Sequence, residues 1–180
     1  VIESQAMFSP EVLGMFNVRH VILQDGQLLS FEEDPMFTQY VVEPKSAWFV
    51  NEILSVERPE QEIQALKKAS FQHLNSAILN TKDFGTSYTA GSDTAGSIEL
   101  IEAEPNRLVY KSSSTEDEFA VFSEVWYGGN PDWIVKIDGK KADFVRVNYI
   151  LRGMEVPAGD HEIVFEFKPK PSGGGITLSA

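Results

Sequence analysis

Between Phe122 and Pro169 the sequence reads F-S-E-V-W-Y (122–127), W-I-V-K-I-D-G (133–139), N-Y-I-L-R (148–152) and V-P-A-G-D-H-E-I-V-F-E-F-K-P (156–169). In the last block Ile163, Phe165 and Phe167 alternate with charged residues, which is typical of a strand with one buried face. Asp138-Gly139 is a strong signal for a two-residue hairpin turn. We therefore expect this part of the chain to fold as a series of antiparallel strands.

Turn signals continue upstream of this stretch, roughly every 8–15 residues, and this spacing favours a β-sandwich over alternating β-α-β units. Pro157-Ala158-Gly159-Asp160 is expected to turn the chain between the last two strands. The strands expected in this half of the chain cover residues 98–104, 108–112, 119–127, 133–137, 140–144, 147–156 and 161–168.

The first half of the chain mixes helix and strand signals. The clearest helix is expected over residues 59–69, because Pro59 opens it, acidic residues occupy its first turn and lysines its last. A short helix is expected from Ser9-Pro10-Glu11, and Asp25-Gly26 predicts a second hairpin. The remaining β-like runs cover residues 18–23, 27–31, 37–42 and 48–56.

Residues 85–96, rich in Gly, Ser and Thr, separate these two kinds of sequence and are the expected internal linker. We predict a β-rich α+β fold, with a C-terminal antiparallel β-sandwich and a smaller N-terminal α/β lobe. The whole chain, 1–180, would form one domain, with the mixed lobe over 1–84 and the sandwich lobe over 97–180.

The charge of the chain excludes two classes of partner. It carries 27 Asp and Glu against 15 Lys and Arg, a net charge of −12 at pH 7, with no basic cluster. Phosphate neutralisation supplies much of the affinity for nucleic acid, so we expect no nucleic-acid partner. An anionic bilayer surface would repel the chain, and no apolar run approaches the roughly 18 residues of a membrane span, so we expect no direct bilayer insertion.

No catalytic or metal-binding pattern is present, so the predicted catalytic residues, metals and cofactors are none. The chain has no Cys, which excludes disulfides and thiolate ligands. Its three histidines, His20, His73 and His161, lack the spacing of a zinc motif. Ser123 lacks the glycines of a nucleophile elbow. The clustered carboxylates are expected to form solvated surface, and they lie at residues 32–34, 99–104 and 116–118.

Glu124 and Arg152 are the most notable charged pair in the quoted stretch. In an alternating strand Glu124 shares a face with apolar neighbours, and Arg152 follows an apolar run. We expect a buried structural ion pair that fixes the strand register. The alternative is that the two residues form a polar anchor in a ligand groove.

Trp126, Tyr127 and Trp133 bracket a loop of the sequence G-G-N-P-D. Aromatic residues beside such a loop can stack on sugar rings, so these three are the candidate glycan contacts. The alternative is that one of Trp126 and Tyr127, which point to opposite faces of a strand, belongs to the core.

The pattern F-S-E-x-x-Y, W-x-x-x-I-D-G, N-Y-x-L-R, V-P-A-G-x-H-x-I-x-F-x-F-x-P resembles the C-terminal extracytoplasmic region of the YfhO-like bacterial membrane proteins. Two upstream pieces are also similar to that region, N-V-R-H-V-I at 17–22 and A-W-F-V-N-E-I at 47–53. The residues that carry the resemblance most specifically lie mainly in the last third of the chain.

The resemblance implies a non-catalytic accessory domain of a multi-spanning protein similar to glycosyltransferases that use lipid-linked sugars. Such a domain lies on the outer face of the cytoplasmic membrane, in the periplasm of a Gram-negative cell. Its expected partners are the membrane helices of its own parent chain and the cell-envelope glycan. Because the chain begins at Val1 and stops without a tail, we expect it to be a piece of that longer protein.

Two other function classes stay open from the sequence. The first is a secreted carbohydrate-binding or adhesion-type β-sandwich. The second is a stand-alone hydrolase, which requires two carboxylates about 5–10 Å apart across a sugar site.

Overall fold

The computed structural model describes residues 10–30, 45–68, 70–85, 88–93, 95–127 and 132–169. The helices are α1 (Pro10–Met15), α3 (Pro59–Leu66) and α4 (Thr81–Phe84). The strands of the first half are β1 (His20–Ile22), β2 (Leu28–Ser30), β3 (Ala47–Val50), β4 (Glu52–Val56) and β5 (Ser76–Asn80). The strands of the second half are β6 (Ser97–Glu104), β7 (Arg107–Ser114), β8 (Glu118–Val125), β9 (Trp133–Ile137), β10 (Lys140–Ala142), β11 (Val145–Val147), β12 (Leu151–Val156) and β13 (Gly159–Phe167).

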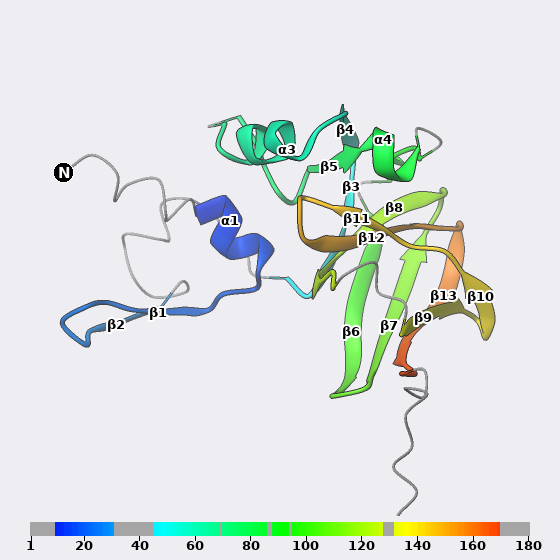
Figure 1. Ribbon diagram of the computed structural model, residues 1–180. Helices are drawn as coiled ribbons and strands as arrows, with labels where there is room; N and C mark the ends of the chain where they lie inside the picture. Colours follow the sequence, from blue (N-terminus) through cyan, green and yellow to red (C-terminus); the bar gives the residue numbers. More distant parts are fainter. Residues whose placement is uncertain are drawn as a thin grey trace, which may run out of the picture.

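The protein is β-rich, as predicted, and the strands of the described residues form two large sheets and a separate two-stranded sheet, β1-β2 (Figure 1). The five-stranded sheet has the order β10-β9-β13-β7-β6, and the six-stranded sheet has the order β3-β8-β12-β11-β5-β4. Every described pairing is antiparallel except that of β4 with β5. This arrangement is consistent with a sandwich-like fold.

The six-stranded sheet is strongly curled. Its two edge strands, β3 and β4, are consecutive in the chain and only Asn51 separates them. One continuous bent segment therefore pairs with β8 through β3 and with β5 through β4. Strands from both sides of the expected linker hydrogen bond in this sheet, while the division into lobes 1–84 and 97–180 stays a prediction.

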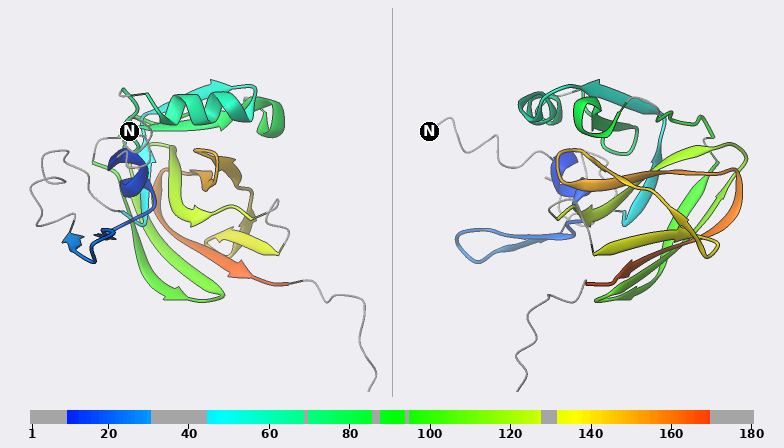
Figure 2. Two further views of the ribbon diagram at one scale, coloured as in Figure 1. Left: turned by 60° about the vertical axis from the view of Figure 1, so that its left-hand side comes forward. Right: turned by 45° about the vertical axis from the view of Figure 1, so that its right-hand side comes forward.

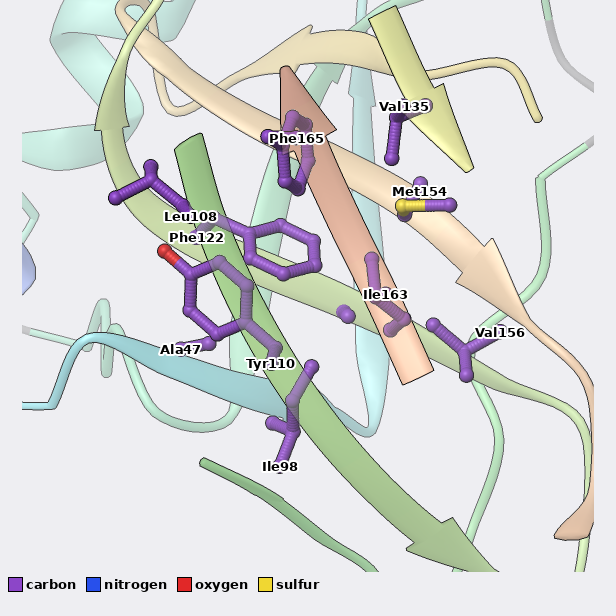
Figure 3. Packing of buried hydrophobic residues seen from close by; sticks show 11 residues of the cluster. Ala47, Ile98, Leu108, Tyr110, Phe122, Val135, Met154, Val156, Ile163 and Phe165 are labelled. Carbon is purple, nitrogen blue, oxygen red and sulfur yellow. The ribbon is translucent and has the colours of Figure 1, made fainter. Parts of the chain in front are cut away.

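The main core lies between the two sheets. Three rings meet edge to face at its centre, with 4.9 Å between the centroids of Tyr110 and Phe122 and 5.0 Å between those of Phe122 and Phe165 (Figure 3). Edge-to-face contacts of this kind add to the stabilisation from burial. The buried cluster consists of Ala47, Ile98, Leu108, Tyr110, Ala120, Phe122, Val135, Met154, Val156, Ile163 and Phe165.

The opposite face of the curled sheet holds a second core, which the helices cover (Figure 2). Met15 of α1 is buried there beside Trp48 and Phe119. Helix α3 packs Ala65 against Ile78 of β5 in a smaller cluster. Residues of β3, β8 and β12 alternate between the two cores, so the middle of the curled sheet is buried on both faces.

Several local predictions are confirmed. Asp25-Gly26 joins β1 to β2, and Asp138-Gly139 joins β9 to β10. Asp138 and Gly139 both have positive φ, 50° and 78°, as the predicted hairpin turn requires. The expected helix over 59–69 is present as α3, with Ala69 outside the described residues, and the expected strand over 37–42 also lies outside them.

Two predictions of local structure were wrong. Pro157-Ala158-Gly159-Asp160 does not turn a hairpin, because β12 pairs with β8 and β11 whereas β13 pairs with β7 and β9. The segment carries the chain from one sheet to the other. The expected strand over 147–156 is interrupted at Asn148 and Tyr149, whose φ values of 50° and 71° make them the turn between β11 and β12.

Candidate functional site

Arg152 is the centre of the candidate site, at the start of β12. The residue is only 1% exposed. Its guanidinium carbon lies 4.3 Å from the ring centroid of Trp133 and 5.4 Å from that of Phe165. Its Nη2 donates a hydrogen bond to the carbonyl oxygen of Val125 at 3.1 Å. The guanidinium thus lies over two aromatic rings from neighbouring strands of the five-stranded sheet, and such contacts with the faces of rings replace part of its lost hydration.

Two nitrogen atoms of Arg152 are not satisfied by this arrangement. Nε and Nη1 are buried and have no hydrogen-bond partner. Burial lowers the pKa of Arg152, and the carboxylate of Glu124 opposes this shift. A buried cation with unsatisfied donors is costly to hold, so its surroundings have to favour the charge.

Glu124 is the nearby charge that the sequence suggested. Burial raises the pKa of Glu124, and the guanidinium of Arg152 opposes that rise. The two side chains do not form a direct salt bridge, although both lie in the described part of the chain. The reason is a register irregularity that places Arg152 opposite Phe122 and Leu151 opposite Val125, so Glu124 is left within the bulge of β8.

The three predicted glycan contacts lie at the same end of the sheets but in different surroundings. Trp126 is half-buried, with ring centroids 5.6 Å from Phe84 and 5.3 Å from Phe144. Trp133 is half-buried beneath Arg152. Tyr127 is 67% exposed. Tyr127 therefore has the most exposed of the three rings and is the best placed for stacking, whereas the rings of Trp126 and Trp133 are half-buried.

Two grooves in the structure are lined by other residues. The larger, of about 660 Å³, runs between β3 and the start of β6 and includes Lys45, Phe49, Asp93 and Glu99. The smaller, of about 510 Å³, lies on the outer face of the five-stranded sheet, where Lys111 has Glu99 and Glu162 on its neighbouring strands. Both volumes fall in the range of small-ligand sites. Neither groove is lined by Trp126, Tyr127 or Trp133.

The predicted carboxylate cluster at residues 32–34 lies outside the described residues, and the clusters at 99–104 and 116–118 have different surroundings. Glu99, Glu102 and Glu104 are exposed on β6, in keeping with the expected solvated face. Glu118 is instead buried, and its Oε1 accepts a hydrogen bond from the backbone N–H of Asp93 at 2.8 Å. Burial raises the pKa of Glu118, and the charge of Asp93 adds to the rise. This carboxylate anchors the segment before β6.

Sequence reasoning missed a second buried charge cluster. Glu62 of α3 is fully buried and accepts two hydrogen bonds from Arg146, at 2.9 and 3.1 Å. Asn80 donates a further bond to Glu62 at 3.3 Å. An acidic residue in the first turn of a helix, such as Glu62, is usually exposed and stabilises the helix dipole. The local sequence does not distinguish such an exposed carboxylate from a buried one.

The histidines have separate structural surroundings. His73 is 1% exposed, and its Nδ1 lies 2.6 Å from Oε2 of Glu11, which ties α1 to the body. His161 lies 2.6 Å from Asp138 through Nδ1 and 3.1 Å from the carbonyl oxygen of Ala158 through Nε2. Within the described ranges, no three potential metal-ligating side chains gather into a group.

Comparison with known proteins identifies no relative: no family model, no curated protein and no solved structure matches this chain. Among the helices of the described residues, none has the length and apolar character needed to cross a bilayer. The functional interpretation therefore rests on the sequence pattern and on the geometry of the site.

Proposed function

We propose that this chain is a non-catalytic extracytoplasmic accessory domain of a YfhO-like membrane protein, and that its aromatic end contacts cell-envelope glycan. Its place is then the outer face of the bacterial cytoplasmic membrane, beside the membrane helices of its parent chain. The finer division into a mixed α/β lobe over 1–84 and a β-sandwich lobe over 97–180 belongs to the same proposal.

The observation that carries the proposal is the packing of Trp133 on the buried guanidinium of Arg152, with the half-buried Trp126 and the exposed Tyr127 directly after the neighbouring strand β8. Most other residues of the quoted pattern form turns, as Asp138-Gly139 does, or belong to the hydrophobic core, as Phe165 does. The aromatic end combines an exposed ring with half-buried rings and a buried cation. Such amphipathic surroundings suit the apolar faces and polar edges of sugars.

The alternative, a secreted carbohydrate-binding β-sandwich, would bind glycan through the same aromatic residues. It differs from the membrane-protein proposal only in what the rest of the gene encodes. A hydrolase is the less favoured candidate. The carboxylates of Glu99 and Glu162 that line the smaller groove both have Lys111 as their cross-strand neighbour, which suits a charge-balanced surface.

Tryptophan fluorescence tests the glycan contact directly. The protein is titrated with neutral, amino-sugar and anionic envelope oligosaccharides, and we expect a saturable change in emission at millimolar ligand or below. Trp48 is buried in the second core and serves as a constant background. Tyr127→Ala should weaken the response and Tyr127→Phe should preserve it. An unchanged spectrum at millimolar ligand for every sugar would reject the contact.

A further inference from the structure

Tyr149 has a backbone conformation that is unfavourable for an aromatic residue. It lies in the turn between β11 and β12 with a φ of 71°, directly after Asn148 with a φ of 50°. Asparagine tolerates this left-handed region, whereas a bulky side chain is strained there. Glycine or asparagine would suit the second position of such a turn better. The turn itself therefore does not account for a tyrosine at this position.

The ring of Tyr149 lies at the surface, next to the guanidinium of Arg146. Tyr149 is 41% exposed, and its ring centroid lies 5.5 Å from the guanidinium carbon of Arg146. The carbonyl oxygen of Tyr149 also accepts a hydrogen bond from Nη1 of Arg146. The ring is thus held in place and still accessible, and a fixed ring loses little conformational entropy when a ligand stacks on it.

Arg146 is itself fixed by the groups around it. The buried carboxylate of Glu62 accepts two hydrogen bonds from it, at 2.9 and 3.1 Å. The guanidinium carbon lies 5.7 Å from the ring centroid of Phe84, and 5.6 Å separates the ring centroids of Phe84 and Trp126. A row of contacts therefore leads from Tyr149 through Arg146 and Phe84 to Trp126, which belongs to the proposed glycan contact.

The carboxylate of Asp83 is the exposed acidic group beside Arg146. Its Oδ2 lies 3.7 Å from Nη2 of Arg146, and the Asp83 side chain is 51% exposed, against 14% for Arg146. Glu62 and Asp83 thus share one guanidinium, and the hydrogen bonds of that guanidinium go to Glu62 and to the carbonyl oxygen of Tyr149. Asp83 therefore keeps acceptor capacity for a ligand. The net charge of −12 also disfavours an anionic ligand.

We propose that Tyr149 and Asp83 form a second glycan contact, and that this contact takes an amino sugar. The apolar face of the pyranose ring would stack on Tyr149, and its ammonium group would form a charge-assisted hydrogen bond with Asp83. Backbone strain of this kind is found at binding sites, where the surrounding structure maintains it. The inference rests on the proposed function for the class of ligand and adds to it a site and a selectivity for charge.

Calorimetric titration of the full chain with three tetrasaccharides tests the selectivity, at mildly acidic pH where the sugar amine is protonated. The ligands are tetramers of glucosamine, of N-acetylglucosamine and of galacturonate. We expect the glucosamine tetramer to bind at least about tenfold more tightly than the acetylated one, which lacks the ammonium group, and the galacturonate tetramer to bind most weakly. Asp83→Asn should remove the difference between the first two. Asp160→Asn makes the same charge change on β13 of the other sheet and should preserve it.

Tyr149→Asn separates a ligand contact from a structural role. Asparagine fits the positive φ, so relief of strain should offset the lost contact with Arg146, and we expect a melting temperature equal to or above that of the natural protein. The affinity for the glucosamine tetramer should fall about tenfold with the lost stacking. Tyr149→Phe keeps the ring and should keep the affinity. A lower melting temperature with unchanged affinity in Tyr149→Asn would overturn the proposal.

The same titrations distinguish failure of this inference from failure of the proposed function. Weakening by Tyr127→Ala without weakening by Tyr149→Asn would overturn the second contact alone. Equal affinities for the amino and acetylated tetramers, or equal effects of Asp83→Asn and Asp160→Asn, would overturn its charge selectivity. Weakening by Tyr149→Asn without weakening by Tyr127→Ala would support this inference and reject the contact at Tyr127. No binding of any tetramer at millimolar concentration would reject both.

Discussion

At the residue scale, Arg152 is held by aromatic rings more than by a carboxylate. Its guanidinium stacks on Trp133, bonds to the carbonyl oxygen of Val125 and feels Glu124 at longer range. The sequence placed Glu124 and Arg152 near one another but could not reveal the bulge that separates them, because a register irregularity leaves no mark in alternation.

Replacing Arg152 by Met tests its structural role. We expect a loss of about 2 kcal/mol in the free energy of unfolding at pH 7, from the lost hydrogen bond and ring contact. Without the guanidinium, the pKa of Glu124 rises further above its unfolded value, so the loss should be larger at pH 7 than at pH 4. Denaturant unfolding at the two pH values measures both effects.

Arg152→Lys is the matched control, since it keeps the charge but not the planar stack. The Arg152→Lys variant should have a lower free energy of unfolding than the natural protein, and the difference should be nearly the same at pH 4 and pH 7. An unchanged melting temperature and a rigid fold in Arg152→Met would argue against a structural role for the residue.

His161 and Asp138 form a pH-dependent link between a hairpin turn and β13. The hydrogen bond with Asp138 raises the pKa of His161 above 6.5, and hydrogen bonds from the backbone of Glu162 and from His161 lower the pKa of Asp138. The stability from protonated His161 is therefore fully present below pH 6.5 and is lost as the pH rises through the raised pKa. The stability from Asp138 is lost as the pH falls below 3.8 through its lowered pKa.

Thermal unfolding of His161→Asn across this range checks the link. The variant should melt below the natural protein at pH 5–6, with the difference shrinking by about pH 9. His20→Asn removes an exposed imidazole on β1 and provides the control. A difference for His161→Asn that stays constant with pH would contradict the assignment.

At the element scale, the Glu62–Arg146 pair joins α3 to β11. Removing one partner of a buried ion pair leaves an uncompensated charge, so Arg146→Met should cost about 3 kcal/mol of the free energy of unfolding. The double variant Glu62→Leu/Arg146→Met should recover most of that loss. Urea unfolding of the two single variants and the double variant measures the coupling, and simple additivity would show that the pair acts independently.

The elements themselves were partly predictable. Hairpins such as the one at Asp138-Gly139 follow from two adjacent residues that accept positive φ. The turn at Asn148 and Tyr149 lacks such a signal, because it depends on contacts with a distant strand: Asn148 accepts a hydrogen bond from the N–H of Ile78 and donates one to its carbonyl oxygen. The alternation of apolar and polar residues also does not indicate that β12 and β13, the strands on either side of Pro157, belong to different sheets.

At the scale of the whole molecule, the β-rich class follows from composition, turn spacing and alternation, whereas the curled sheet does not. Its closure depends on the bend at Asn51, between two strands that the sequence presents as one run. The aromatic site is similar. Trp126, Tyr127 and Trp133 could be singled out as residue types beside a loop, but the contact of Trp133 with Arg152 required the packing of both sheets.

The complete reading frame around this chain tests the proposed function most directly. If the chain is the accessory domain of a YfhO-like protein, sequencing the gene on both sides should reveal about a dozen hydrophobic segments of roughly 20 residues, each long enough to span a bilayer. A reading frame that adds only a single signal peptide to this domain would contradict the account and favour the secreted carbohydrate-binding sandwich.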